Sequence, residues 1–319
     1  MLGITGDKML SHLDRVVGDH KPITADVFLT NYCNNSCPYC TYRRWNLEDG
    51  AYSMGYDEFV LYAERLLSFG VQGIILTGGG EPTVCRDFEK ITAWMESRSI
   101  HYGINTNLNR MVRIKPDYLK VSLDGWDEDS YAERRGVRHY QLARKNIQAY
   151  AAWKRENSPG TSLGIQCVVK SVEDVEKFFS ANRDLDVDYI VFRPEESTGG
   201  KAYAGESARA SAAEIIQAVN NFTEIDSRVV CNFKWHLLGV QERDCVAAWS
   251  QIAMNERGGI MFCCHKPYQV LGHIMDEDIL EKKAAAVTDM RTCDVPCRLT
   301  APNAFVASTM AERKDACFL

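Results

Sequence analysis

Three cysteines, Cys33, Cys37 and Cys40, share one short stretch, with three residues between the first pair and two between the second. Thiolates this close repel one another, so they are seldom gathered without a metal or a bridge. A structural zinc site normally closes with four ligands, and no fourth Cys or His lies nearby in this stretch. A cubane iron–sulfur cluster held by three cysteines leaves one iron free. The spacing therefore indicates an incomplete metal site with an open position.

The same stretch carries an aromatic residue, Tyr39, directly before its last cysteine. A Cys-x3-Cys-x2-Cys run with this aromatic residue resembles the radical S-adenosylmethionine (SAM) superfamily. The resemblance implies that Cys33, Cys37 and Cys40 hold a 4Fe-4S cluster. It also implies that the open iron chelates the amino and carboxylate groups of SAM, with Tyr39 among the cofactor-binding residues. A zinc site or a chance match is the alternative.

A glycine run, Gly78-Gly79-Gly80, follows an expected strand and leads into Glu81. Because glycine has no side chain, the backbone of such a run can approach a ligand closely. A tight strand-to-helix turn is the alternative. Taken with the cysteine stretch, Gly79, Gly80 and Glu81 resemble the Gly-Gly-Glu motif that receives the SAM ammonium group in the same superfamily.

Ser122 and Asp124 end another expected strand on the same face, because side chains two apart share a face. They are predicted to face inward and to bind ribose hydroxyls or the SAM carboxylate, and a helix N-cap pair is the alternative. The segment Ser-Leu-Asp-Gly resembles the strand end of radical SAM peptide and sugar enzymes, in which an Arg-Gly pair follows. Arg135 and Gly136 match that pair, so Arg135 is expected to meet the SAM carboxylate. The neighbouring Arg134 competes for this assignment.

Three further polar residues lie on expected strands. Asn105 and Asn107 flank Thr106 at the tip of an expected strand, and asparagine is also common in turns. Of the two, Asn105 is predicted to bind the cofactor. Gln166 shares a strand face with Gly164, and a small residue beside a polar one would suit an adenosine pocket. A buried structural glutamine is the alternative. Arg193 is a candidate to clamp a substrate carboxylate or phosphate, with an ordinary ion pair as the alternative.

A second set of cysteines follows Trp235: Cys245, Cys263, Cys264, Cys293 and Cys297. Their order, with Gly259 before the Cys263-Cys264 doublet, resembles the SPASM or twitch extension of radical SAM enzymes. In that extension a cysteine, a hairpin glycine, a second cysteine and a later pair bind an auxiliary 4Fe-4S cluster. The resemblance implies one auxiliary cluster with four ligands, Cys245, Cys264, Cys293 and Cys297. A zinc knuckle is the alternative, and Cys263 or His265 are alternative ligands to Cys264.

Apolar and β-branched runs predict six strands, over residues 24–29, 73–77, 101–105, 118–124, 162–169 and 189–193. Helical patterns are expected over 54–69, 87–97, 140–156, 173–182 and 212–222. This alternation predicts an α/β fold with a parallel sheet wound in right-handed units. The superfamily resemblance sharpens it to a partial (β/α)6 TIM-like barrel over residues 1–225. A small α+β twitch/SPASM-like domain is expected over 226–319.

Composition narrows the function further. The chain has 319 residues, 45% of them hydrophobic, which suffices for one large core or one core with a smaller appendage. Its net charge of −6 gives no basic footprint for a nucleic-acid backbone. We expect neither a signal peptide nor a membrane span from the apolar pattern. The twelve cysteines then favour a reducing, cytoplasmic location and metal ligation over disulfides.

The resemblance implies an enzyme that cleaves SAM reductively to a 5′-deoxyadenosyl radical, with a flavodoxin- or ferredoxin-type electron donor. That radical would abstract hydrogen from a substrate carbon, leading to oxidation, epimerisation or crosslinking of a peptide or an amino-sugar-like small molecule. One alternative is an isomerase or modification enzyme for a nucleoside or nucleobase. A cluster of Lys and Arg beside the barrel mouth would favour it, with Arg43, Arg44 and Arg138 as candidates. The other alternative is a non-enzymatic metal-cluster-binding protein.

Overall fold

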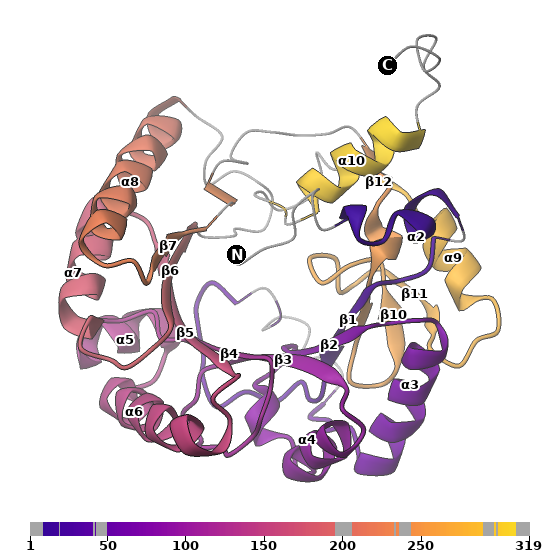
Figure 1. Ribbon diagram of the computed structural model, residues 1–319, viewed down its shortest axis with the longest axis horizontal. Helices are drawn as coiled ribbons and strands as arrows, with labels where there is room; N and C mark the ends of the chain where they lie inside the picture. Colours follow the sequence, from indigo (N-terminus) through magenta and orange to yellow (C-terminus); the bar gives the residue numbers. More distant parts are fainter. Residues whose placement is uncertain are drawn as a thin grey trace.

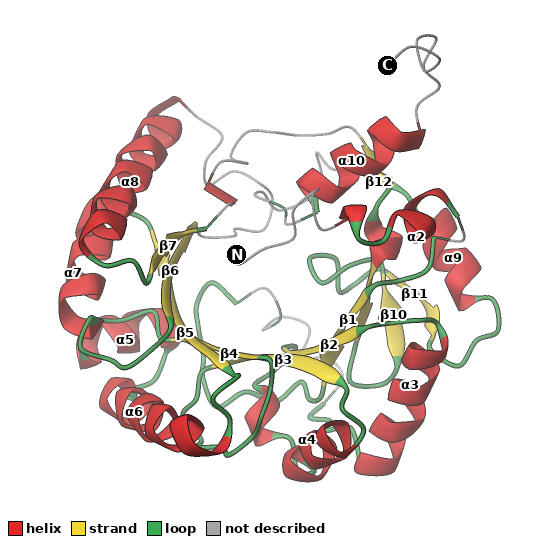
Figure 2. Ribbon diagram, in the orientation of Figure 1, coloured by secondary structure: helices red, strands yellow, loops and turns green. Residues whose placement is uncertain are grey.

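The computed structural model describes residues 9–18, 20–40, 42, 50–194, 206–232, 234–235, 244–289, 297 and 299–310. Its strands form one strongly curved sheet, and helices from α3 to α8 lie along the outer, convex side of the curve (Figure 1). Figure 2 shows the same layering, with red helices outside a yellow arc of strands. The arrangement is an incomplete α/β barrel with a mostly parallel sheet, which confirms the predicted fold class.

Among the described residues, the main sheet has ten strands in the order β11-β10-β9-β1-β2-β3-β4-β5-β6-β7. Pairing is parallel from β9 to β7 and antiparallel from β9 through β10 to β11. The strands are β1 (Thr24–Phe28), β2 (Gly73–Thr77), β3 (His101–Thr106), β4 (Tyr118–Ser122), β5 (Ser162–Val169), β6 (Tyr189–Pro194), β7 (Val229–Cys231), β9 (Gln251–Met254), β10 (Gly259–Met261) and β11 (Val270–His273). A separate two-stranded sheet pairs β8 (Asp244–Cys245) with β12 (Thr288–Asp289).

The described α-helices are α2 (Leu13–Val17), α3 (Tyr56–Ser68), α4 (Phe88–Ser97), α5 (Glu128–Arg135), α6 (Tyr140–Asn157), α7 (Val172–Asn182), α8 (Glu206–Ile225), α9 (Ile279–Ala285) and α10 (Thr300–Met310). Two short 3-10 helices are η1 (Pro82–Val84) and η3 (Ala248–Ser250). None of the helices in the described part of the chain combines the length and the apolar character needed to cross a membrane.

Alternation along β1 shows where the core lies. Ala25 and Val27 are fully buried in the main apolar cluster, which includes the helix residue Phe59. Phe28 points the other way and packs in a separate cluster with Ala253. Because successive side chains of a strand face opposite sides, one set of residues packs on the helices and the other faces the barrel interior. The main core therefore lies between the sheet and the helices, and the alternate residues of the strands face the barrel interior.

Two glycines inside the sheet make room for tyrosine rings. A Cβ atom on Gly103 would lie 2.0 Å from the Tyr118 ring, and one on Gly164 would lie 2.0 Å from the Tyr189 ring. Only glycine leaves the rings this space. The sequence-based interpretation of Gly164 is therefore wrong, because Tyr189 fills the room beside this glycine, which was expected to be part of an adenosine pocket.

The chain after β4 differs from the prediction in two ways. β4 ends at Ser122, and Asp124 lies beyond it with a left-handed φ of 46°, a conformation that Asp tolerates better than most residues. α5 was not predicted, because Ser130 and Tyr131 are its buried residues and it lacks an apolar stripe. Its sequence signal is a capping box, in which Asp127 Oδ1 accepts from the Ser130 N–H at 2.7 Å.

The chain beyond residue 225 joins the same sheet as the first part. β7 pairs parallel with β6, and β9 pairs parallel with β1 from Thr24 to Val27. The β10–β11 hairpin continues the sheet, while β8, β12, α9 and α10 supply the smaller α+β part (Figure 1). The division into domains at residues 225 and 226 stays a prediction.

Candidate functional site

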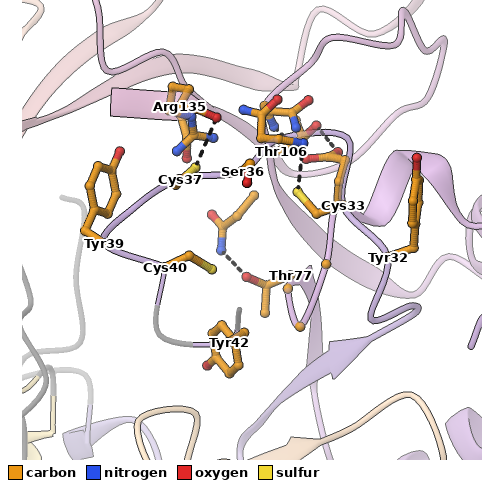
Figure 3. A pocket seen from close by; sticks show the side chains of 18 of the residues that line it. Tyr32, Cys33, Ser36, Cys37, Tyr39, Cys40, Tyr42, Thr77, Thr106 and Arg135 are labelled. Carbon is orange, nitrogen blue, oxygen red and sulfur yellow. Dashed lines mark hydrogen bonds between the residues drawn. The ribbon is translucent and has the colours of Figure 1, made fainter. Parts of the chain in front are cut away.

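A cavity of about 680 Å³ lies where the parallel strands end. The carboxyl ends of parallel strands are where α/β folds bind ligands. All residues predicted for the first cluster and for SAM line this cavity: Cys33, Cys37, Tyr39, Cys40, Gly79, Gly80, Glu81, Asn105, Ser122, Asp124, Arg135 and Gln166. Arg193 lines it as well. Figure 3 shows the three cysteines around one part of the cavity, with Thr77 and Arg135 on its walls.

The cysteine thiols are shielded from water. Cys37 is buried, and Cys33 and Cys40 are partly buried. Burial is the main cause that raises the pKa of Cys33 to about 12, and it also raises the pKa of Cys37 above its usual range. These two thiols therefore keep their protons at neutral pH, and metal binding has to release them.

The described residues contain no group of three Cys, His, Asp or Glu side chains that is ready to hold a single metal ion. In a cubane cluster each cysteine binds a different iron, so its ligands are spread more widely than those of one zinc ion. Three cysteines that line a roomy cavity fit the cluster better than they fit one ion.

The carboxylate of Asp124 fixes the end of the cysteine stretch. Its Oδ2 accepts from the Tyr39 hydroxyl and from Arg135 Nη1, both at 2.9 Å, and its Oδ1 accepts from the Val168 N–H at 2.7 Å. The side chains of Asp124 and Arg135 are 2% and 11% exposed, so this is a buried ion pair. The hydrogen bonds from Tyr39 and Val168 stabilise the carboxylate further. Burial, followed by the charge of Asp124, raises the pKa of Tyr39, which keeps its proton and remains a donor.

The backbone at the end of α5 supports the same stretch. The carbonyl of Arg135 accepts from the Ser36 N–H at 2.9 Å and from the Cys37 thiol at 3.9 Å. Gly136 follows with a left-handed φ of 72°, and a Cβ atom there would lie 2.4 Å from the Ser36 carbonyl oxygen. The Arg135 carbonyl thus supports the cysteine stretch in addition to the guanidinium group, and Gly136 leaves the space that the Ser36 carbonyl needs.

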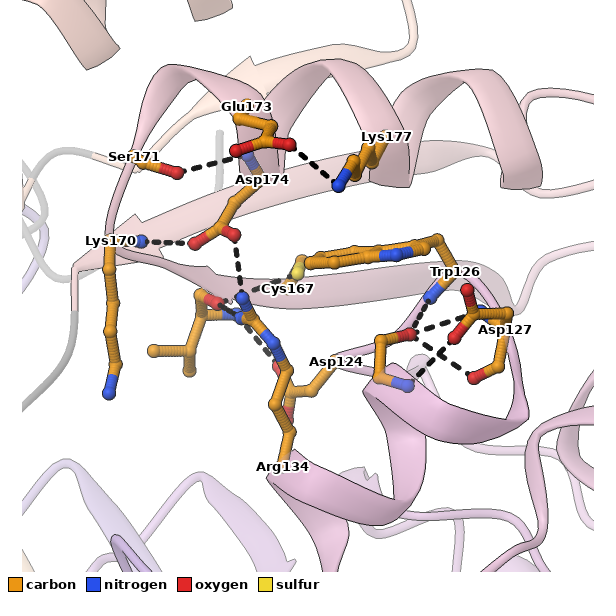
Figure 4. A network of polar contacts seen from close by, with 12 residues as sticks. Asp124, Trp126, Asp127, Arg134, Cys167, Lys170, Ser171, Glu173, Asp174 and Lys177 are labelled. Atoms are coloured by element: carbon orange, nitrogen blue, oxygen red, sulfur yellow. Dashed lines mark hydrogen bonds and ion pairs between the residues drawn. The ribbon is translucent and has the colours of Figure 1, made fainter.

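The side chain of Arg134 belongs to a different network. Its Nη2 donates to Asp174 Oδ1 and its Nη1 to the Val168 carbonyl, both at 2.7 Å, and its guanidinium lies over the Trp126 ring (Figure 4). Arg134 does not line the cavity, whereas Arg135 does. The choice between the two arginines therefore falls on Arg135.

The glycine run is built against the strand that leads into the cysteines. The Gly80 N–H donates to the Thr30 carbonyl at 2.8 Å, and the Glu81 N–H donates to the Tyr32 carbonyl at 2.9 Å. A Cβ atom on Gly80 would lie 1.9 Å from the Tyr32 oxygen, so no other residue fits there. On Gly79 the nearest contact would be 3.4 Å, which is ordinary packing.

The carboxylate of Glu81 is occupied by protein donors. It accepts from the Thr83 hydroxyl at 2.7 Å, from the Thr106 hydroxyl and from the Asn107 N–H at 2.8 Å. The side chain of Asn107 in turn donates to Asn34 Oδ1 at 2.7 Å, inside the cysteine stretch. Thr106 was not predicted as a site residue, and Asn107 was considered with Asn105 but not assigned to the cofactor. Their position directly after Asn105, at the end of a predicted strand, was the available signal.

Asn105 has an unsatisfied acceptor inside the cavity. Its Nδ2 donates to Thr77 Oγ1 at 3.2 Å, while its buried Oδ1 has no hydrogen-bond partner among the described residues. Buried polar atoms are nearly always paired, so this oxygen marks a position for a ligand donor. Ser122 and Gln166 line the same wall. The polar side chains of Ser122 and Gln166, together with the open acceptor of Asn105, fit a cluster-bound ligand that carries amino and hydroxyl groups, as SAM does.

The second cysteine set is brought together in part. Cys245 and Cys297 are buried in one small apolar cluster with Phe262 and Leu299, and Cys263 packs against it. These residues come from three separate segments of the chain. An apolar setting around several thiols is suited to a cluster or a metal site shielded from water.

The two adjacent cysteines pack in different apolar clusters, and the choice of Cys264 as a ligand stays a prediction. Cys264 does not belong to the cluster of Cys245 but packs in the one that contains Phe28, and its carbonyl accepts a hydrogen bond from the Tyr42 hydroxyl. The predicted spacing could not show this, because neighbouring residues point in different directions. Cys293, also predicted as a ligand, lies outside the described residues.

A buried lysine lies beside this second set. Lys283 on α9 is 1% exposed, and its Nζ donates to the carbonyls of Met261 and Phe262. Burial lowers the pKa of Lys283 to about 8, against the opposing effect of Cys263, Cys245, Cys264 and Asp26.

Comparison with known proteins connects this geometry to a family. The profile described as the radical SAM superfamily matches residues 27–165. The chain is 28% identical over 202 residues to Fe-coproporphyrin III synthase of Methanosarcina barkeri, which covers 60% of this chain and 48% of that protein. It is 29% identical over 191 residues to molybdenum cofactor biosynthesis protein 1 of Drosophila melanogaster, covering 53% and 31%. The chain thus matches less than half the length of each of these relatives.

Solved structures share the fold. Streptococcus suis SuiB bound to S-adenosylmethionine is similar with a TM-score of 0.60 and 15% identity, over 87% of this chain and 68% of that chain. The protein anSMEcpe with bound AdoMet is similar with a TM-score of 0.61 and 17% identity, over 82% of each chain. At this level of identity the likeness shows a common fold.

The clash at Gly80 predicts different outcomes for two adjacent substitutions. Gly80→Ala should displace the Tyr32 carbonyl next to Cys33, lower the free energy of unfolding by about 1–3 kcal/mol and reduce iron incorporation. Gly79→Ala is the matched control and should change both quantities little. Urea unfolding and the iron content of reconstituted protein measure the difference. Equal behaviour of the two variants would contradict the close approach at Gly80.

The buried pair at Asp124 predicts a loss of order in the cysteine stretch. Asp124→Asn leaves the Arg135 charge buried without its partner, so we expect a loss of about 3–5 kcal/mol in unfolding free energy. Iron content after reconstitution should fall with it. Asp129→Asn is the control, because its pair with Arg138 is exposed, and stability should stay nearly unchanged. Wild-type stability in Asp124→Asn would show that the pair is dispensable.

Proposed function

We propose that this chain, in which residues 27–165 match the radical SAM superfamily profile, cleaves SAM reductively and abstracts a hydrogen atom from a substrate carbon. Members of that superfamily are enzymes that use a 4Fe-4S cluster and SAM. One observation carries the proposal: the three cysteines, the glycine run and the polar strand ends all line a single cavity. Each of these features comes from a different part of the chain, and the fold brings them together.

In this proposal the chain binds and orients the reacting groups. Cys33, Cys37 and Cys40 hold the cluster, which with SAM supplies an electron and a 5′-deoxyadenosyl radical. The backbone at Gly79 and Gly80 lies close to the SAM ammonium group. The open Oδ1 of Asn105 accepts a hydrogen bond from the ligand.

The remaining predicted residues divide into two roles. Ser122 and Gln166 bind the nucleoside part of SAM from the strand ends. Asp124 acts as a positioning residue, since its oxygens already accept from Tyr39, Arg135 and Val168. Holding the cysteine stretch rigid keeps the cluster and SAM in one geometry, which is how a protein raises the rate of such a step.

We assign the substrate to the part of the cavity at Arg193 of β6 and its strand neighbour Val168 of β5. A cavity of about 680 Å³ admits small molecules or a single side chain of a peptide. SuiB has been solved with its precursor peptide SuiA, and anSMEcpe with a peptide, and both share this fold. This supports a peptide or an amino-sugar-like small molecule as substrate, with oxidation, epimerisation or crosslinking as the outcome.

A nucleic-acid substrate has less support in the described residues. Arg138 forms an exposed pair with Asp129 and does not line the cavity, while Arg43 and Arg44 lie outside the described residues. The cationic side chains that do line the cavity within the described part of the chain are Arg135 and Arg193. The peptide or small-molecule proposal is therefore preferred over the nucleoside or nucleobase one.

The proposal includes two further components. A flavodoxin- or ferredoxin-type protein in the cytoplasm would deliver the electron. A second, auxiliary 4Fe-4S cluster at the later cysteines would accept the substrate electron or shape the substrate site. A non-enzymatic cluster-binding protein is the competing function, and SAM cleavage separates the two.

Removing the first cysteine set should abolish activity. The triple variant Cys33→Ala, Cys37→Ala, Cys40→Ala is expected to form no 5′-deoxyadenosine from SAM under reducing conditions, measured by chromatography and mass spectrometry. The double variant Cys245→Ala, Cys297→Ala is the control, and it should lose only part of the iron. SAM cleavage at the wild-type rate by the triple variant would overturn the assignment of the cluster.

Deuterium transfer identifies the substrate class. Reaction with deuterated peptides should place deuterium in 5′-deoxyadenosine, because the radical takes hydrogen directly from the substrate carbon. Deuterated amino sugars and nucleosides are tested in parallel. Transfer from nucleosides alone would replace the preferred substrate class with the alternative, and absence of SAM cleavage would favour the non-enzymatic function.

A further inference from the structure

The chain makes a tight turn directly after β3. The Leu108 N–H donates to Thr106 Oγ1 and the Asn109 N–H donates to Asn107 Oδ1, both at 2.9 Å. Leu108 has a left-handed φ of 52°, a conformation that leucine adopts only at a cost in free energy. The turn is therefore held in a shape that its own sequence does not favour.

Contacts from two other segments hold this turn in place. Asn146 on α6 is buried, and its Nδ2 donates to the carbonyls of Leu108 at 2.9 Å and Asn109 at 3.2 Å. From the other side, the Glu81 carboxylate accepts from the Asn107 N–H at 2.8 Å. The backbone of the turn is thus fixed both to the outer helix and to the segment that follows the glycine run.

Two amide side chains of the fixed turn reach the cysteine stretch. Asn107 Nδ2 donates to Asn34 Oδ1, and Asn109 Nδ2 donates to Asn35 Oδ1, both at 2.7 Å. The other orientation of the Asn35 amide accepts from Arg135 Nε at 3.1 Å and keeps the contact with Asn109. Because Asn107 and Asn109 are 2% and 8% exposed, water competes little for these hydrogen bonds.

The two asparagines that receive these contacts lie between Cys33 and Cys37, two of the predicted cluster ligands. The Asn35 N–H donates to Cys33 Sγ at 3.4 Å. The direction of this N–H depends on the backbone of the stretch, which the side chains of Asn34 and Asn35 connect to the turn after β3. A hydrogen bond to a sulfur ligand stabilises the reduced, more negative state of an iron–sulfur cluster, so it raises the reduction potential.

We propose that Asn107 and Asn109 are positioning residues for the first cluster, which hold the Asn35 N–H on the Cys33 sulfur and thereby raise the reduction potential of that cluster. The inference deepens the proposed function and rests on it for the nature of the cluster. The cost of the left-handed Leu108 is then explained, since both of its neighbours contact the cysteine stretch.

The midpoint potential of the first cluster tests the role of Asn107. In the Cys245→Ala, Cys297→Ala background only the first cluster is expected, with about four iron atoms per chain after reconstitution. Adding Asn107→Ser keeps an oxygen that can accept from the Asn109 N–H in the turn, but the shorter side chain no longer reaches Asn34. We expect the potential to move to a more negative value, measured by redox titration with electron paramagnetic resonance.

A buried hydroxyl at the other end of the barrel provides the matched control. Thr161 is 2% exposed, lies directly before β5 and donates to the Pro116 carbonyl. Thr161→Val should lower the temperature of thermal unfolding without moving the potential. An equal shift of the potential in Thr161→Val and Asn107→Ser would show a general loosening of the barrel and would exclude a specific positioning role.

Double-mutant cycles test the two contacts themselves. Asn34→Ala removes the partner of Asn107, so it should shift the potential in the same direction as Asn107→Ser, and the combined variant should shift it no further. Asn109→Ser with Asn35→Ala forms the second cycle. Fully additive shifts, or the background potential in both Asn107→Ser and Asn109→Ser, would overturn the inference.

Hydrogen exchange covers variants that take up too little iron for a titration. In the iron-free proteins, the backbone amides of residues 33–37 should exchange faster in Asn107→Ser and Asn109→Ser than in the background protein, with unchanged exchange in the helices. Unchanged exchange over residues 33–37 would count against the inference. None of these measurements involves SAM, so failure to cleave SAM alongside shifted potentials would remove the proposed reaction and leave the positioning role in place.

Discussion

The first site depends on a single buried carboxylate, that of Asp124. Its three donors come from the cysteine stretch, from the end of α5 and from β5. A charge removed from water has to be compensated by hydrogen bonds and an opposite charge, so the three elements cannot separate without leaving that charge exposed to an apolar interior. Asp124 itself has a left-handed φ of 46°. The position of the Asp124 carboxylate after β4 therefore fixes the position of the cysteine stretch.

Both cysteine sites have the same physical composition. Each combines thiols shielded from water with one buried cationic side chain, Arg135 beside Cys37 and Lys283 beside Cys263. Iron–sulfur clusters ligated by thiolates are anions, and their potentials respond to nearby charge and hydrogen bonding.

The sequence predicted the parts of the site that are local in the chain. Spacing identified Cys33, Cys37 and Cys40, and the strand ends placed Asn105, Ser122 and Gln166 on one cavity, because parallel strands end at the same edge of a sheet. β2 and β5 were predicted with the observed bounds, because both segments are rich in apolar and β-branched residues.

The sequence could not show in which direction a side chain points or which distant segments contact one another. Nothing in the doublet distinguishes Cys263 from Cys264, because the direction of each side chain is set by backbone contacts of the turn. The hydrogen bond from Asn107 to Asn34 joins two loops that only the folded barrel brings together. Gly164 was misread because the ring that fills its space belongs to the next strand.

The parallel pairing of β1 with β9 affects how the molecule is made. Thr24 pairs with Gln251, so the strand that delivers the cysteine stretch gains its second neighbour only from a segment near the other end of the chain. During synthesis, β1 has β2 on one side and an open edge on the other until β9 has been made. Long-range parallel pairing is slow to form, and open strand edges favour wrong association. Completion of the barrel around the cysteine stretch is therefore a late step in folding during synthesis.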